Sequence, residues 1–172
     1  MQNAIVPILG FAAASGTGKT TLLTQLIPLL TQHGFRVGLI KHSHHKFEID
    51  KPGKDSYRLR KAGASPVMLI SSHRRAIITE FDHVIEPILD EQLKSFDQSE
   101  LDLILVEGFK AENFPKIELH RQVLDYPPRY PNDNTIIALA SDVTLSLPKP
   151  LVLLNLNNPL MIANFIIQRF LS

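Results

Sequence analysis

The chain has 172 residues, enough for one α/β domain with a sizeable core, and we expect a single nucleotide-binding domain over residues 1–172. Its formal net charge of +1 argues against a nucleic-acid partner, and the lack of cysteine excludes disulfides, thiolate metal sites and thiol catalysis. With no apolar run of about 18 residues and no basic N-terminal region, we expect no membrane span, no signal peptide and a cytoplasmic protein.

An apolar stretch over residues 5–12 predicts a buried strand, and a helical pattern follows over residues 19–33. Between them lies a glycine-rich loop, Ala13-Ala14-Ser15-Gly16-Thr17-Gly18-Lys19-Thr20. Strand, glycine loop and a helix beginning with Lys-Thr are the signature of a phosphate-binding P-loop. Ala13 replaces the first glycine of the strict pattern, and as the mildest replacement it should preserve the loop.

The residue types of this loop suit a nucleoside triphosphate with Mg²⁺. Glycines let backbone N–H groups approach phosphates, and the helix start adds unpaired N–H groups and a positive dipole end. Lys19 supplies a charge for the β- and γ-phosphates, and the Thr20 hydroxyl suits a Mg²⁺ ligand. The predicted nucleotide-binding residues of the loop are Ser15, Gly16, Thr17, Gly18, Lys19, Thr20 and Thr21.

A second strand over residues 36–41 precedes a polar stretch over residues 42–54. Within it, Asp50 is a candidate for supporting the metal or orienting a water. A transition-metal site is a weaker reading of the histidines, because His44 and His45 point apart in an extended chain and no cysteine accompanies them. Basic residues suggest either a basic lip for an anionic partner or a solvated charged face: Lys41, Lys51, Lys54, Arg58 and Lys61.

The rest of the chain alternates between strand and helix patterns. We predict a helix over 55–61, hairpin strands over 65–70 and 74–79, a helix over 84–96, strands over 101–106 and 116–119, a loop over 126–134, strands over 135–140 and 151–154, and a helix over 158–171. This order predicts a P-loop NTPase-like three-layer α/β sandwich with a mainly parallel central sheet and a small β-hairpin insertion. Ligands of such sheets bind at the carboxyl ends of the strands.

Two further carboxylates stand at strand ends. Glu107 follows the apolar stretch 101–106, where P-loop proteins need an acidic group to hold the metal or its waters; otherwise it is a solvated strand terminus. Asp142 follows the strand over 135–140, where a carboxylate suits the paired donors of guanine; otherwise it is a turn residue. We predict Lys19, Glu107 and Asp50 as catalytic residues, Thr20 and Glu107 as metal ligands, and Asp142 as a nucleotide contact.

Taken together, the chain resembles the MobB family, molybdopterin-guanine dinucleotide biosynthesis protein B. The Asp50–Gly63 block and Val106-Glu107-Gly108-Phe109-Lys110 carry more of this resemblance than the glycine loop, which many families share. The segments that carry it are 11–23, 38–42, 50–56 with 59–64, 101–110 and 137–142.

The resemblance implies a homodimeric GTP-binding protein with weak GTPase activity, which helps to attach GMP to molybdopterin alongside the nucleotidyltransferase MobA. It implies that residues 15–21 hold the phosphates, Thr20 the Mg²⁺, that Glu107 lies near the metal, and that Asp142 faces the base. It also makes the molybdopterin phosphate a candidate ligand for the basic lip.

The sequence leaves the mechanism open. Hydrolysis would be an in-line attack of water on the γ-phosphate, with Lys19 and Mg²⁺ stabilising charge. Nothing selects an arginine finger, which would come across a dimer from one of Arg74, Arg75, Arg121 or Arg129, so turnover should be slow. Two alternatives are a small-molecule kinase with its acceptor near Asp50, and a nickel-delivery GTPase using His42, His44 and His45.

Overall fold

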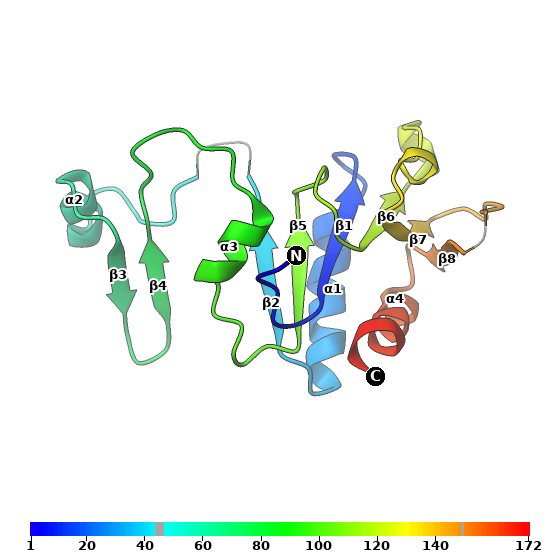
Figure 1. Ribbon diagram of the computed structural model, residues 1–172, viewed down its shortest axis with the longest axis horizontal. Coiled ribbons are helices and arrows are strands. Elements are labelled where there is room, and N and C mark those ends of the chain that lie inside the picture. Colours follow the sequence, from blue (N-terminus) through cyan, green and yellow to red (C-terminus); the bar gives the residue numbers. More distant parts are fainter. Residues whose placement is uncertain (44–46, 149) are drawn as a thin grey trace. The chain divides into compact units, whose positions relative to one another are not determined.

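The computed structural model describes residues 1–43, 47–148 and 150–172 and divides into two compact units (Figure 1). The first unit comprises Met1–His42 and Ile88–Ser172, and the second comprises Ser43–Pro87. The first unit contains the glycine loop and the main sheet, whereas the second is inserted between two of its elements. Two histidines of the predicted metal site, His44 and His45, lie outside the described residues.

In the described part of the first unit, six parallel strands form one sheet in the order β2-β5-β1-β6-β7-β8. The chain builds one side through β2 and β5 and then crosses β1 to build the other, so the strand order reverses beside β1. Such a reversal opens a crevice at the carboxyl ends of the strands. The strands are β1 (Ile8–Ala13), β2 (Val37–Lys41), β5 (Leu103–Glu107), β6 (Lys116–His120), β7 (Ile136–Ser141) and β8 (Val152–Asn155).

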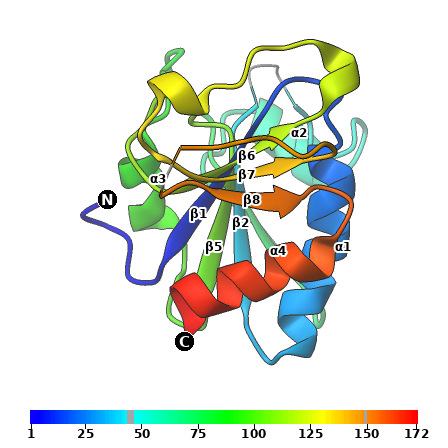
Figure 2. The same ribbon diagram turned by 90° about the vertical axis from the view of Figure 1, so that its right-hand side faces the viewer.

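Helices cover both faces of this sheet and complete the predicted three layers. The α-helices of the first unit are α1 (Lys19–Gln32), α3 (Leu89–Ser95) and α4 (Pro159–Ile166). Helices α1 and α4 lie side by side on one face of the sheet (Figure 2). There Leu26 of α1 and Ile162 of α4 pack with Leu9 of β1. On the opposite face α3 buries Leu93 against Ile104 of β5. Because neighbouring strand residues face opposite sides, one apolar run supplies both cores.

Several element ends differ from the predicted ones, and proline explains two of them. The first strand begins at Ile8 and not at residue 5, because Pro7 has no N–H for the ladder. The helix predicted over 84–96 begins only at Leu89, because Pro87 disfavours a helical conformation in the residue before it. The closing helix is α-helical as far as Ile166 and then continues as a π-helical turn, η3 (Ile167–Leu171).

The second unit consists of α2 (Asp55–Lys61) and a two-stranded antiparallel sheet, β3 (Val67–Ile70) and β4 (Arg75–Ile78). The predicted hairpin insertion is therefore confirmed. The Arg60 side chain, only 5% exposed, ties the unit together by pairing with Glu48 and Glu80. A buried guanidinium between two carboxylates gives this small unit a polar centre in place of a large apolar core.

The segment after β6 holds two short 3₁₀ turns, η1 (Gln122–Leu124) and η2 (Tyr130–Asn132), where the sequence predicted only a loop over 126–134. Among the described residues, no helix has the length and apolar character that crossing a membrane would require.

Candidate functional site

The glycine loop leaves the carboxyl end of β1 and enters α1 through a left-handed backbone. Gly16 has φ +78° and Gly18 has φ +96°, a region that residues with a Cβ rarely adopt. Gly18 is the N-cap of α1, and none of the described side chains caps this helix start. The first N–H groups of α1 therefore keep their capacity to donate to an anion.

Thr17 stabilises the loop from inside. It is 2% exposed, and its hydroxyl donates to the backbone carbonyl of Ala14 at 2.8 Å. This contact closes the loop on itself before any ligand binds. Of the other predicted phosphate contacts with side-chain hydroxyls, Ser15, Thr20 and Thr21 are exposed.

A charged triad forms where the helix start meets two strand ends. The Lys19 ammonium lies 3.3 Å from Glu107 Oε1, and the Lys41 ammonium lies 3.5 Å from the same oxygen. The Glu107 side chain is 14% exposed and that of Lys19 18% exposed, whereas that of Lys41 is 54% exposed. Two ammonium groups against one carboxylate leave this cluster with an excess of positive charge.

The turn after β5 fixes the position of Glu107. Its carbonyl accepts a hydrogen bond from the His42 N–H at 2.8 Å, and a Cβ at Gly108 would lie 2.7 Å from the His42 Cβ. Gly108, with φ +101°, is thus required both by its backbone angle and by this close approach. Phe109 is then buried, its ring centre 4.9 Å from that of His42. The contacts of Glu107, Gly108 and Phe109 with His42 therefore hold the Glu107 carboxylate at the carboxyl edge of the sheet.

Asp142 and Arg121 connect the far side of the sheet to the glycine loop. Asp142 Oδ1 accepts from the Gln122 N–H at 3.0 Å, and Asp142 Oδ2 lies 3.5 Å from Arg121 Nη1. Arg121 Nε in turn donates to the Thr17 carbonyl at 3.2 Å. The sequence suggested Arg121 only as a residue acting across a dimer, whereas here it contacts the loop of its own chain. Arg121 directly follows β6, and β6 pairs with β1. The sequence did not reveal this pairing, so it could not place Arg121 beside the glycine loop.

Within the described residues, one cavity lies on each side of the loop. One, of about 210 Å³, lies between the start of α1 and the segment after β8. The residues that line it are Gly18, Thr21, Leu22, Gln25, Arg121, Leu156, Asn157 and Pro159. The other, of about 190 Å³, lies on the β6 side of the loop. Sequence reasoning missed Gln25 and Asn157 as residues of the site, because neither belongs to a recognised motif.

Asp50 and most of the basic lip belong to the second unit and are described there alone. Asp50 is 9% exposed, and its Oδ1 accepts from the Ser56 hydroxyl at 2.9 Å. Its Oδ2 is buried and has no hydrogen-bond partner among the described residues. Lys61 lies over the Tyr57 ring at 5.5 Å, and the remaining second-unit cations of the lip are exposed: Lys51, Lys54 and Arg58. In the described ranges, no group of three or more His, Cys, Asp or Glu is arranged to hold a metal ion.

Comparison with known proteins places this geometry in a family. Residues 8–142 match the family model of MobB, molybdopterin guanine dinucleotide synthesis protein B. The chain belongs to the MobB family. It is 48% identical to the molybdopterin-guanine dinucleotide biosynthesis adapter protein of Escherichia coli K12 over 165 residues, 95% of this chain and 93% of that one. It is 45% identical to the protein of the same description from Haemophilus influenzae over 166 residues, 96% of this chain and 90% of that one.

A solved MobB structure agrees with the fold. A crystal structure described as molybdopterin-guanine biosynthesis protein B superposes with a TM-score of 0.72 at 23% identity, covering 94% of this chain and 98% of that one. The resemblance to the MobB family and the predicted three-layer fold are both confirmed. As a MobB-family member, the chain has its place among adapter proteins of molybdopterin-guanine dinucleotide biosynthesis.

Proposed function

We propose that this protein is a GTP-binding adapter of molybdopterin-guanine dinucleotide biosynthesis with slow, Mg²⁺-dependent GTPase activity. The observation that carries the proposal is the glycine loop, whose left-handed Gly16 and Gly18 open onto a helix start that no described side chain caps. Lys19 lies at that start with a carboxylate partner already 3.3 Å away. Successive N–H groups, a helix dipole and an ammonium group together suit a polyphosphate.

Phosphate binding would redistribute the charges around Glu107. In the free protein Glu107 holds Lys19 and Lys41 on one oxygen. A triphosphate on the loop competes for Lys19, while Lys41 stays as the counter-ion of Glu107. Glu107 can then interact with the metal while it keeps Lys41 as an ion-pair partner.

The residues present fit Mg²⁺, which takes oxygen ligands and shares its shell with phosphates. Thr20 is the second residue of α1 and exposed, and Glu107 ends the strand beside β1. We assign these two as the residues that hold the metal, directly or through water. When bound, Mg²⁺ neutralises charge on the transferred phosphoryl group. The predicted role of Asp50 in orienting the attacking water stays a prediction, because Asp50 belongs to the second unit.

For the nucleoside we propose the cavity of about 210 Å³, which begins at Gly18 and Thr21. Asp142 is our candidate for the donor pair of guanine, held in place by Arg121 and the Gln122 N–H. Asp142 does not itself line the cavity of about 210 Å³ and is connected to it through Arg121, whereas Asn157 lines it and adds an amide with both a donor and an acceptor.

We further propose a cytoplasmic homodimer that works with MobA and handles molybdopterin. In the second unit Met68 and Ile77 lie opposite each other across the hairpin, 56% and 55% exposed, with Ile70 75% exposed nearby. An exposed apolar sheet face of this kind suits a second copy of the chain. We expect light scattering to give twice 19.3 kDa for the native chain and a lower mass for Met68→Glu with Ile77→Glu. A Lys94→Glu variant controls for added acidic charge, and an unchanged mass in the double variant would place the dimer contact elsewhere.

The two lysines on Glu107 give the decisive experiment for nucleotide binding. Lys19→Ala should weaken Mg²⁺-GTP binding by about 10- to 100-fold, the worth of a charge-assisted hydrogen bond. Lys41→Ala removes an equal charge from the same carboxylate oxygen and should cost only a few-fold. Calorimetry with GTP and ATP measures both variants. Equal losses in the two variants, or none in either, would contradict the assignment of the glycine loop.

A further inference from the structure

The cavity on the β6 side of the glycine loop plays no part in the function proposed above. Ala13, Ala14 and Thr17 form one wall, so its contents would lie next to a bound nucleotide. Cationic side chains reach it from two other segments, Lys110 after β5 and Arg129 after β6. Its volume of about 190 Å³ is smaller than that of sites for drug-sized ligands, so it would suit only a small molecule.

Positive charge predominates in this cavity. Lys110 and Arg129 are both exposed at the rim of the cavity. Partial desolvation lowers the pKa of Lys110, and the positive charges of Lys19 and Arg129 lower it further. Among the described residues, the side chains of Lys110 and Arg129 form no ion pair within 4 Å, although the charge of Arg129 acts to lower the pKa of the Glu118 and Asp133 carboxyls. Arg121 also lines the cavity, although Asp142 partly neutralises its charge. An anion between Lys110 and Arg129 would relieve this repulsion.

A buried carboxylate builds the wall that carries Arg129. Glu118 is 4% exposed, its Oε1 accepts from the Arg129 N–H at 2.6 Å, and its Oε2 accepts from the Tyr130 N–H at 2.9 Å. Burial raises the pKa of Glu118, and these two hydrogen bonds oppose that rise. Because both Glu118 oxygens accept hydrogen bonds from backbone N–H groups of the segment after β6, that segment is held beside the cavity before a ligand binds. Such preorganisation lowers the cost of binding.

Most of the remaining lining is apolar or aromatic, with Leu119 from β6 and Leu124, Tyr126 and Pro127 from the segment after it. His120, the last residue of β6, also lines the cavity. A flat ring would pack on this surface while an acidic group meets the cations. A phosphate monoester carries about −1.5 to −2 charge at neutral pH, which matches two cations better than a carboxylate does.

We propose that this cavity binds an aromatic phosphate monoester as a second ligand, beside the nucleotide, with its phosphate between Lys110 and Arg129. The inference rests on the proposed function in placing a nucleotide on the glycine loop. It differs from the basic lip in using residues of the first unit alone. The ring would lie on Leu124, Tyr126 and Pro127.

Phenyl phosphate is the probe, titrated into the full chain loaded with Mg²⁺-GDP and, separately, with a non-hydrolysable GTP analogue. We expect saturable binding at one site per chain in both nucleotide states. Lys110→Ala and Arg129→Ala should each weaken it about tenfold or more, as loss of a charge-assisted hydrogen bond implies. Lys94→Ala, which removes an exposed lysine paired with Glu91, is the matched control and should bind normally. Inorganic phosphate should bind more weakly, because it lacks the ring, and phenol should not bind.

Three outcomes would overturn the proposal. They are no saturable binding in either nucleotide state, equal binding in all three variants, and binding to the GDP-loaded chain but not to the chain loaded with the GTP analogue. The last would assign the cavity to the γ-phosphate itself. Each variant is first checked for the circular dichroism of the native chain, and the two cationic variants lie on different segments, so one is informative if the other misfolds. Failure of the nucleotide proposal is seen separately in the Lys19→Ala titration.

Discussion

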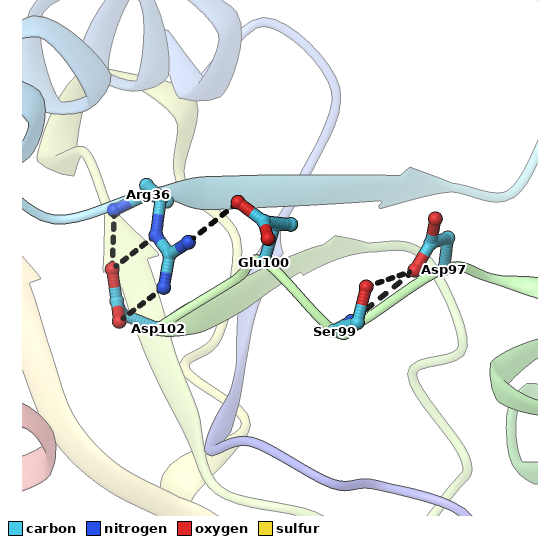
Figure 3. Close-up of polar contacts among 5 residues, drawn as sticks. All are labelled: Arg36, Asp97, Ser99, Glu100 and Asp102. Carbon is cyan, nitrogen blue, oxygen red and sulfur yellow. Dashed lines mark hydrogen bonds and ion pairs between the residues drawn. The ribbon is translucent and has the colours of Figure 1, made fainter.

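The two ends of β5 carry acidic residues with opposite surroundings. At the amino end, Asp102 Oδ2 accepts from the Arg36 backbone N–H at 2.7 Å and from Arg36 Nε at 3.3 Å, and Glu100 takes the Arg36 Nη1 at 2.9 Å (Figure 3). At the carboxyl end, Glu107 meets two ammonium groups. Acid exceeds base in the first cluster, and base exceeds acid in the second.

We infer from this difference that the first cluster is a structural contact and the second belongs to the proposed binding site. The Asp102 and Arg36 backbones also bond to each other, since the Asp102 N–H donates to the Arg36 carbonyl at 2.8 Å. That cluster joins the start of β5 to the chain entering β2. Its Arg36 and Glu100 side chains are exposed, and that of Asp102 is half-buried. The Glu107 cluster is more enclosed and keeps positive charge that a polyanion can neutralise. We therefore expect the carboxylates at the two ends of β5 to have different roles.

The largest effect should come from Glu107→Gln. We expect the rate of Mg²⁺-dependent GTP hydrolysis to fall on the order of 10- to 100-fold, because the amide is a poorer partner for the metal and for Lys19. Phosphate release under saturating GTP measures this. Asp102→Asn, an identical change at the other end of the strand, should leave the rate unaltered. A comparable fall in the hydrolysis rate in both variants would contradict the inference that the two ends of β5 have different roles.

A smaller effect is expected at Asp142, which also lies at the carboxyl edge. Asp142→Asn should narrow the preference for GTP over ATP by about tenfold, since the amide matches the guanine donor pair less well. Because Asp142 also holds Arg121, Arg121→Lys is the matched variant and should change the affinity for both nucleotides alike. Competition binding gives the ratio directly. If Asp142→Asn behaves as Arg121→Lys does, Asp142 positions the loop and does not read the base.

The smallest effect concerns Asp102 and stability. The hydrogen bonds from the Arg36 backbone and then from its side chain hold the pKa of Asp102 below its usual range. A depressed carboxyl pKa contributes stability above the unfolded value, and this contribution disappears as the pH falls through the folded value. Asp102→Asn should therefore lower Tm slightly at neutral pH. The difference in Tm between the native chain and the variant should shrink in acid, below the ordinary Asp pKa. Thermal unfolding from pH 7 down to about pH 3 tests the sign, and a gap that widens in acid would contradict it.

Local patterns were sufficient for much of the fold. The helix from Lys19, the helix from Asp55 and the hairpin follow from residue periodicity and turn residues within a few positions. The delayed start of α3 was also encoded locally, by Pro87, although the apolar pattern around it masked that signal. Which strand neighbours which could not be derived in this way, because pairing depends on contacts between distant segments.

What the sequence alone determined is the glycine loop, its flanking strand and helix, and the family, because each depends on residue types at fixed short spacing. Tertiary structure decided which residues join that loop. Arg121 contacts Thr17 only because β6 lies next to β1, and Glu118 holds Arg129 only because the intervening segment folds back. The conformational preferences of a short segment depend on its own residues and can be read from the sequence. Whether charges from distant segments come together depends on how the buried surfaces of the sheet and helices pack.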